Sequence, residues 1–357
     1  MLKVDPTVQT LTVAGIIAIA LSVLINGTLS SHSQDKPTAQ MAAAETGVSA
    51  KGSWAASATG RVEPKDGEIR LVSQAPGEIL EVIAKTGDKV QSGDLLVRLD
   101  DSDAQAKLTA ALAEEAVRVL ERDEEVAKGP ALDRRNAEDA VSTAERAVYA
   151  AQTSLDDIAR KVRGGTSTAD ELNSARKTLA DAQTKLSEER AALAEVAARA
   201  DMPLPSRLES SLTLARSDVT QILNAIERTR VRAPADGTVL NVWAKQGEVA
   251  VTSPEAPLAL FGDLGSLRVR TEVEERDVTK IRVGQKAVVK ADAFGAQEFT
   301  GVVTSIAPAL GAQRITSRGP RRPNDVEVLE VMVALDGQPP LLTGMRVDVF
   351  FKADEAS

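Results

Sequence analysis

Two similar segments set 160 residues apart constrain the fold of this chain more than any other feature of its sequence. Residues 77–88 read GEILEVIAKTGD and residues 237–248 read GTVLNVWAKQGE, so six of the twelve positions are identical without a gap. An Ala-Pro pair precedes each copy, and the β-forming residues between the glycines predict short strands that end in turns. The two copies therefore predict a β-domain that the chain leaves and later completes.

The first copy continues through residues 90–100 as VQSGDLLVRLD, and the combined pattern resembles a lipoyl or biotinyl half-motif. Two half-motifs of this kind make one small β-sandwich. We therefore expect residues 72–100 and 231–262 to fold together as a lipoyl-like domain; the alternative is two unrelated β-hairpins. The expected turn residues are Gly77, Gly87, Asp88, Gly93, Gly237 and Gly247.

Carrier domains that resemble this sandwich modify a lysine in the turn between the two halves. In this chain the corresponding residues 99–103 read LDDSD, and the next lysine is Lys107, inside the expected helix that follows. The sequence therefore favours a structural sandwich and no cofactor.

The segment between the half-motifs, residues 101–230, is rich in Ala, Glu, Arg and Leu and predicts a long antiparallel helical hairpin. Small and apolar residues recur in steps of three and four along 137–162, 172–200 and 208–226, which is the coiled-coil signature. The chain reverses at residues 163–168, where Thr168 and Glu171 have the spacing of a capping box. The alternative is a coiled coil that serves only dimerisation.

Both arms of the expected hairpin are interrupted at one level. If the reversal centres near residue 166, Gly129 and Pro130 lie opposite Pro203, with Pro205 close by. Proline inside a helix removes a hydrogen bond, so this level is expected to be a hinge or a bundle junction. Fully extended, an arm of about 60 residues reaches roughly 90 Å, which suits a protein that bridges a gap.

The N-terminal region predicts a membrane anchor. Residues 11–29 carry no charge and, at 1.5 Å per residue, span roughly 28 Å, close to the hydrocarbon thickness of a bilayer. A cleaved signal peptide is the alternative, although its apolar region is usually shorter. Residues 1–10 would then be a cytoplasmic N-terminus and residues 30–52 a polar linker.

The C-terminal region returns to alternating β-structure. Residues 263–309 predict a small β-barrel, with a short helix near 274–281. Residues 310–353 include further alternating strands, which we expect to pair with residues 53–71 as a membrane-proximal β-domain. The fold class expected for the whole chain is α+β, multidomain and elongated.

The composition excludes most catalytic machinery. The chain of 357 residues has no cysteine, one histidine and a net charge of −9. A Cys-based metal site, a thiolate nucleophile and a His-rich metal site are therefore excluded, and the acidic balance argues against nucleic-acid binding. No catalytic, cofactor or metal residues stand out, so we expect the protein not to be an enzyme.

The order of these parts resembles the periplasmic adaptor family, also called membrane fusion proteins or HlyD-like secretion proteins. The resemblance covers roughly residues 54–351 and is most specific over residues 60–100. It implies an inner-membrane protein of a Gram-negative bacterium, with its body in the periplasm. It also implies an adaptor for efflux or secretion that joins an inner-membrane transporter to a TolC-like outer-membrane channel. The implied assembly is a homo-oligomeric ring, commonly a hexamer.

The resemblance indicates an adaptor, but it leaves more than one type of partner transporter open. Because the chain has no Walker-type motif of its own, the energy would come from the partner transporter. We favour an ABC-type exporter from the overall resemblance to that branch of the family. The alternatives are a proton-driven RND-type pump and a coiled-coil scaffold of the envelope without a transport role.

The reversal at residues 163–168 would be the hairpin tip that contacts the channel. Adaptors that dock TolC-like channels carry Arg, Leu and Ser at three spaced tip positions, where this chain has Asp157, Lys161 and Thr168. Only the hydroxyl is kept, which places docking to such a channel in doubt. The candidate contact residues are Arg163, Gly164, Gly165, Thr168 and Leu172.

Overall fold

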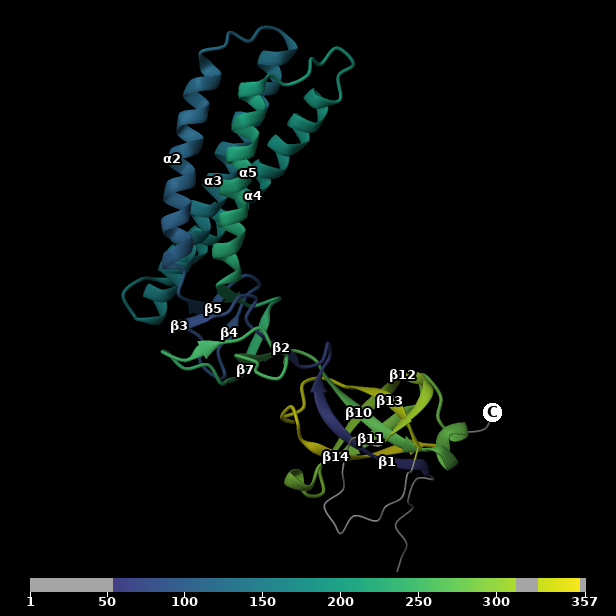
Figure 1. Ribbon diagram of the computed structural model, residues 1–357. Helices are drawn as coiled ribbons and strands as arrows, with labels where there is room; N and C mark the ends of the chain where they lie inside the picture. Colours follow the sequence, from purple (N-terminus) through teal and green to yellow (C-terminus); the bar gives the residue numbers. More distant parts are fainter. Residues whose placement is uncertain (1–53, 313–326, 354–357) are drawn as a thin grey trace, which may run out of the picture. The chain divides into compact units, whose positions relative to one another are not determined.

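A computed structural model describes residues 54–312 and 327–353 of the chain (Figure 1). These residues form a β-sandwich, a helical insert and a β-barrel. The expected anchor at 11–29 and the linker at 30–52 lie outside the described ranges. Within those ranges, no helix combines the length and the apolar character that crossing a bilayer requires.

The sandwich interleaves strands from both half-motifs. One sheet has the order β2 (Ile69–Leu71), β9 (Ala259–Gly262), β7 (Gly237–Val242), β4 (Lys89–Val90), and the other β6 (Arg230–Arg232), β5 (Leu95–Leu99), β3 (Gly77–Val82), β8 (Val249–Ala250). The buried core between them draws on both halves and includes Ile79, Leu96, Leu99, Val239 and Phe261. The two half-motifs therefore form one domain, as predicted. Strand β2 belongs to this sandwich and not to a membrane-proximal domain.

The sequence repeat is also a repeat of hydrogen bonds. Gly77 of β3 pairs with Ala250 of β8, and 160 residues later Gly237 of β7 pairs with Val90 of β4. The Gly87 N–H donates to the Val239 carbonyl at 2.8 Å, and the equivalent N–H of Gly247 donates to the Ile79 carbonyl at 2.9 Å. Each half thus completes the other, so neither is a hairpin that folds alone.

The insert consists of four helices: α2 (Ser102–Asp123), α3 (Pro130–Arg163), α4 (Ala169–Ala197) and α5 (Arg207–Arg228). Helix α3 packs closely against α4, and α2 against α5, and each pair buries apolar residues of its own. Strands β5 and β6 are hydrogen-bonded neighbours, with Val97 opposite Val231. Because β5 leads into α2 and α5 leads into β6, the insert leaves and re-enters the sandwich at adjacent points.

The predicted antiparallel helical hairpin is confirmed, but its expected extension as one straight arm is wrong, because the α3–α4 pair folds back along the α2–α5 pair. The Gln105 amide of α2 donates to the Tyr149 hydroxyl of α3 at 3.1 Å, and Arg122 donates to Asp139 at 2.7 Å. Helices α2 and α3 therefore lie side by side and antiparallel, because residues later in α2 contact residues earlier in α3. The result is a four-helix bundle (Figure 1). Its longest helix, α3, has 34 residues and a length of about 51 Å, well short of the expected arm.

The remaining strands close into one antiparallel barrel. Its order is β1 (Trp54–Pro64), β10 (Leu267–Glu274), β13 (Glu327–Leu335), β12 (Glu298–Ala312), β11 (Lys286–Lys290), β14 (Arg346–Lys352). Alternate residues of these strands point inward, and the core includes Val62, Val269, Val331 and Phe351. Strand β1 pairs with β14, as expected for residues 53–71 and the C-terminal strands. The expected division into a barrel at 263–309 and a separate membrane-proximal domain at 53–71 and 310–353 is corrected, because β1, β13 and β14 belong to the same barrel as β10, β11 and β12. The short helix expected near 274–281 is the 3₁₀ turn Glu275–Lys280.

Candidate functional site

The predicted turn glycines lie where the two halves of the sandwich exchange strands. Gly87, Gly93 and Gly247 have φ values of +92°, +85° and +83°, a region that residues with a Cβ rarely adopt. The Asp88 carboxylate accepts a hydrogen bond from the Lys85 N–H at 2.9 Å, which closes the first of these turns. The roles of these residues are conformational: they shape the sandwich.

Gly77 and Gly237 occupy equivalent positions in the two half-motifs, but the room for a side chain differs between them. A Cβ at Gly237 would lie 2.5 Å from the Phe261 ring and 3.0 Å from the Gly262 carbonyl oxygen. A Cβ at Gly77 would lie 3.4 Å from the nearest atom, in the Leu99 side chain. Only the second half-motif therefore requires glycine for close packing at this position.

The predicted hairpin tip is a turn between α3 and α4, and it does not lie at the far end of the insert. Gly164 caps α3, Gly165 has φ +74°, and Thr168 caps α4 through the predicted capping box with Glu171. Arg163 is the last residue of α3 and Leu172 lies in the first turn of α4.

The sandwich lies beside this turn. Arg160 of α3 is 3.4 Å from the Glu81 carboxylate of β3, and Arg176 of α4 donates to the Asp94 carboxylate at 3.0 Å. Arg232 of β6 also binds Asp156 of α3 at 2.8 Å. The expectation that residues 163–172 form the outermost tip is therefore wrong for this arrangement of the helices.

The residues at the predicted break level lie together at the opposite end of the bundle. Gly129 has φ +57° and precedes α3, whose first residue is Pro130. The Pro203 carbonyl accepts a hydrogen bond from Arg134, and Pro205 directly precedes the α5 cap. Two linkers, residues 124–129 and 198–206, form this end of the insert.

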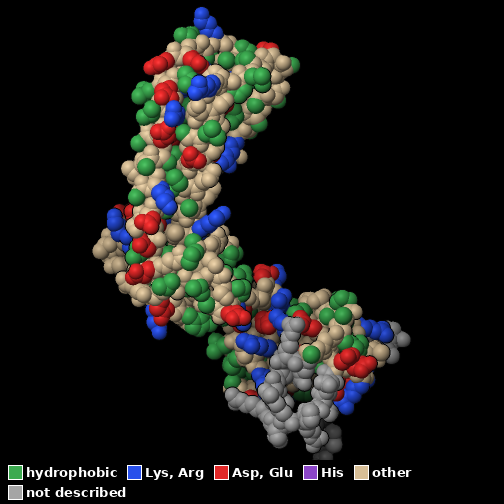
Figure 2. Space-filling view, in the orientation of Figure 1, with side chains coloured by type: hydrophobic (Ala, Val, Ile, Leu, Met, Phe, Trp, Pro, Cys, Tyr) green, Lys and Arg blue, Asp and Glu red, His purple; other side chains and the backbone are tan. Residues whose placement is uncertain are grey.

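The two linkers carry exposed apolar side chains as well as charges. Val126 is 82% exposed and Leu204 is 92% exposed. Figure 2 shows acidic, basic and hydrophobic side chains mixed along the visible face of the molecule. That face has no continuous basic tract of the kind that binds a phosphate backbone.

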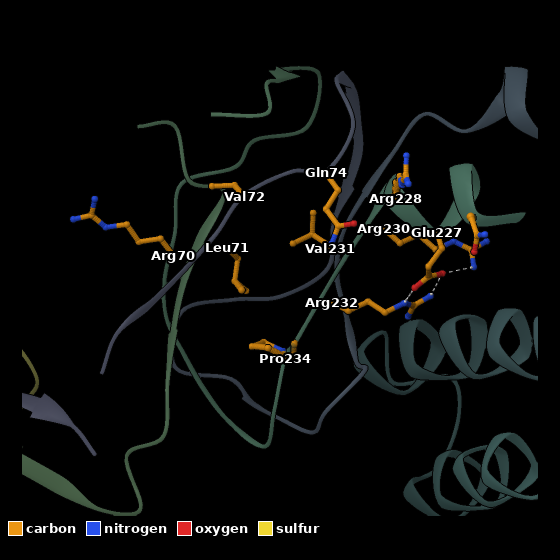
Figure 3. A pocket seen from close by; sticks show the side chains of 12 residues that line it. Arg70, Leu71, Val72, Gln74, Glu227, Arg228, Arg230, Val231, Arg232 and Pro234 are labelled. Carbon is orange, nitrogen blue, oxygen red and sulfur yellow. Dashed lines mark hydrogen bonds and ion pairs between the residues drawn. The ribbon is translucent and has the colours of Figure 1, made fainter. Parts of the chain in front are cut away.

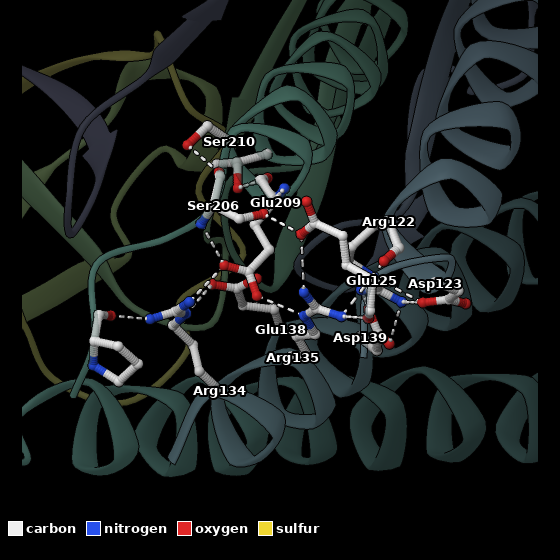
Figure 4. Close-up of polar contacts among 12 residues, drawn as sticks. Arg122, Asp123, Glu125, Arg134, Arg135, Glu138, Asp139, Ser206, Glu209 and Ser210 are labelled. Carbon is white, nitrogen blue, oxygen red and sulfur yellow. Dashed lines mark hydrogen bonds and ion pairs between the residues drawn. The ribbon is translucent and has the colours of Figure 1, made fainter. Parts of the chain in front are cut away.

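A buried ionic cluster holds this end together (Figure 4). Glu209 of α5 accepts from Arg134 at 2.6 Å and from Arg135 at 2.5 Å, and all three residues are at most 8% exposed. Burial would raise the pKa of the Glu209 carboxyl, but these hydrogen bonds outweigh it and lower the pKa. Ser206 adds a 2.7 Å hydrogen bond to Glu125, which ties one linker to the other.

A second polar cluster lies between the helix pairs. Asp139 of α3 accepts from Arg122 of α2 at 2.7 Å and from Arg216 of α5 at 2.5 Å. Burial would raise the pKa of Asp139, but the two guanidinium groups hold it below the ordinary value. One turn further along α3, Ser142 donates to the buried Glu115 of α2 at 3.0 Å.

Sequence reasoning missed both clusters, although one signal for them is present. Ser206 and Glu209 have the spacing of a capping box, and the structure contains that box at the start of α5. The pattern predicts a helix start but not the two arginines that meet the same glutamate. Those contacts depend on α3 lying beside α5.

A cavity of about 510 Å³ lies between the end of α5 and strands β2 and β6 (Figure 3). Its charged lining residues are Arg70, Glu227, Arg228, Arg230 and Arg232. Glu227 is paired with Arg232, so part of this charge is already neutralised. Across residues 54–312 and 327–353, no group of His, Cys, Asp and Glu is arranged to hold a metal ion.

Comparison with known protein families identifies a match over most of the sandwich and its insert. The family model described as "RND MFP, barrel-sandwich hybrid domain" matches residues 68–261, more than half of the chain. The match spans the sandwich and its helical insert.

Curated relatives carry names from export systems. The chain is 27% identical over 251 residues to the multidrug export protein EmrA of Escherichia coli K12; the match covers 69% of this chain and 61% of that protein. It is 25% identical over 313 residues to the pyoverdine export membrane fusion protein PvdR of Pseudomonas aeruginosa, covering 84% of this chain and 70% of PvdR. The chain thus spans about three fifths of the length of EmrA.

Among solved structures, MacA from Actinobacillus actinomycetemcomitans is similar with a TM-score of 0.51 and 18% sequence identity. The likeness covers 84% of this chain and 78% of that one. At this identity it supports the fold alone.

Proposed function

Since this chain belongs to the membrane fusion protein family, the periplasmic adaptors whose barrel-sandwich hybrid domain matches residues 68–261, we propose that it couples an inner-membrane exporter to an outer-membrane channel. The observation that carries the proposal is the sandwich built from two half-motifs with a helical insert between them. That arrangement provides a rigid base and an arm, and it offers protein-binding surfaces rather than reacting groups.

The kind of exporter is the finer part of the proposal. We favour an ABC-type exporter, as the sequence resemblance does. The name of the matched family model, which refers to RND membrane fusion proteins, favours the alternative of a proton-driven RND-type pump. In either case the energy comes from the partner, and the chain itself is not an enzyme.

The assembly and location follow from the same proposal. The body lies in the periplasm of a Gram-negative bacterium, and residues 11–29 anchor it in the inner membrane. Copies of the chain form a ring, commonly of six. The barrel faces the exporter, and the helical insert extends toward the channel.

The test is a crosslinking pull-down from intact envelopes with a C-terminal tag, read by mass spectrometry. Recovery of an inner-membrane exporter together with an outer-membrane channel supports the adaptor, and the exporter's sequence identifies it as ABC-type or RND-type. Recovery of the exporter alone restricts the role to the inner membrane. Recovery of neither partner contradicts the proposal and favours the scaffold.

A further inference from the structure

Although the insert is folded in two, both helix pairs keep the same antiparallel register, in which the numbers of two facing residues have a nearly constant total. Within the α2–α5 pair, Glu115 meets Arg216, so the two residue numbers total 331. Within the α3–α4 pair, Asp133 meets Arg199, a total of 332. One straight antiparallel hairpin would pair the same residues. Each helix therefore has the neighbour that an extended arm would give it.

The apolar clusters lie mainly within the two pairs, and Tyr149 of α3 is the side chain that packs from one pair against the α2–α5 cluster. Leu108 of α2 packs with Val219 and Ile226 of α5, and all three are buried. On the α3–α4 side, Ala151, Leu155 and Ala175 are buried. Straightening the insert would leave these seams in place, because each seam joins helices that stay together.

The contacts between the pairs are mainly polar. They include Asp139 with Arg122 and Arg216, and Glu115 with Ser142 and Arg146. Charged groups that separate into water recover hydration, unlike apolar surface. Opening the surface between the pairs therefore withdraws the Tyr149 ring from the α2–α5 cluster but otherwise separates mainly polar groups.

Both connections needed for such an opening lie at the same end. Residues 124–129 and 198–206 link the pairs there; Val126 and Leu204 are among their exposed side chains. Gly129 ends one linker and Pro130 begins α3 directly after it, and Pro203 and Pro205 lie in the other linker, so neither linker favours a regular helix. Rigid elements joined by a few residues at their ends form a hinge.

We propose that the insert is a hinged arm held folded in this structure, and that the α3–α4 pair swings out about these two linkers. In the open form α2 and α3 lie end to end, and so do α4 and α5, and the turn at 163–168 becomes the outermost point. The polar contacts of Asp139 and the Glu209 cluster hold the arm closed, together with the ion pairs that join α3 and α4 to the sandwich, Arg232 with Asp156 and Arg176 with Asp94. The use of such an arm rests on the proposed adaptor function, but the motion itself does not.

The change in distance is large enough to measure directly. In the closed form Arg160 touches Glu81, so dyes on the nearby exposed residues Arg163 and Lys85 lie within roughly 30 Å of each other. In the open form α2 and α3 together place 22 and 34 helical residues between the sandwich and Arg163, a length of roughly 84 Å. Because the chain has no cysteine, Lys85→Cys and Arg163→Cys provide two specific labelling sites.

Single-molecule energy transfer on the purified full chain tests the motion. Asp139→Asn weakens contacts between the pairs, whereas the control Glu145→Gln weakens an α3–α4 ion pair with Arg190 that both forms keep. We expect a low-transfer population that grows at least threefold in Asp139→Asn and stays unchanged in Glu145→Gln, with far-ultraviolet circular dichroism constant. A single high-transfer population in Asp139→Asn, or equal opening in both variants, would overturn the proposal.

A second experiment separates the arm from the adaptor role. Glu81→Cys and Arg160→Cys, joined by a short bismaleimide, hold the arm closed. In the envelope pull-down, we expect the bridge to remove the outer-membrane channel but keep the exporter. Equal recovery of the channel with and without the bridge refutes the need for opening. Absence of both partners before bridging refutes the adaptor function, while the energy-transfer result still decides the motion.

Discussion

The unequal packing of the two repeat glycines makes a sharp prediction. In Gly237→Ala the new methyl would lie 2.5 Å from the Phe261 ring, which is 2% exposed and packed in the sandwich core. The backbone of Gly262, which pairs with Thr238, blocks the other side. In Gly77→Ala the methyl meets only ordinary contacts.

The expected magnitudes follow from two opposing effects. Overpacking a core costs about 1–3 kcal/mol. Replacing glycine by alanine where the backbone accepts it stabilises by about 0.4–1 kcal/mol through the unfolded state. Gly237→Ala should therefore lose about 0.5–2 kcal/mol, and Gly77→Ala should match or slightly exceed the parent.

The assay needs a probe confined to the sandwich, because the chain has several domains and one global transition is not assured. Trp243 follows β7, and the other tryptophan, Trp54, begins the barrel strand β1. In a Trp54→Phe background, the fluorescence of Trp243 during urea unfolding reports the sandwich. Adding Phe261→Leu to Gly237→Ala should cost less than the two separate changes together, because it removes the clash.

Two results would refute this reasoning. One is a Gly237→Ala variant as stable as the parent. The other is an equal loss in Gly77→Ala, since that would make the glycines sensitive to backbone conformation and not to the ring of Phe261.

Three further predictions concern the helical insert. Glu209→Gln leaves Arg134 and Arg135 without their buried counter-charge and should cost about 3–5 kcal/mol in urea unfolding followed by circular dichroism at 222 nm; a cost below 1 kcal/mol would contradict the cluster. The pKa values of Asp139 and Glu209 are lowered from 3.8 and 4.5, so their stabilisation is complete above those values and should fade as the pH drops below about 4.5; a flat melting temperature from pH 6 to pH 3 would disprove it. Thr168→Ala removes the α4 cap and should cost about 1 kcal/mol in the same unfolding assay, with Thr168→Ser as the control that keeps it.

The fold of the sandwich could be predicted because its two half-motifs repeat in the sequence. The glycines at 87 and 247 mark equivalent turns, and the strand pairing repeats with the same offset of 160 residues. Helix neighbours were predictable for a related reason: the spacing in the segments that contain Leu155, Leu179 and Val219 indicates an apolar seam on each helix, and a seam needs a partner helix.

The fold-back of the insert was not predictable from that spacing. A straight and a folded hairpin satisfy the same seams, so the choice depends on polar contacts such as Arg122 with Asp139. Charged residues on a helix face usually indicate solvent, and their pairing across helices has no periodic signature. The predicted boundaries of the barrel were wrong for a different reason. Alternation identifies the strands, and the pairing of β1 with β14 was expected, but alternation does not show that β1 and β13 also pair with β10, which makes one barrel.

The adjacency of β5 and β6 bears on how proteins of this kind can diversify. Both ends of the insert leave from paired strands, with Arg98 opposite Arg230. An insertion whose ends already meet does not strain its host domain, whatever its length. The helical segment can therefore be lengthened, shortened or replaced in evolution to match a different partner. The core and the strand order of the sandwich stay the same in each case.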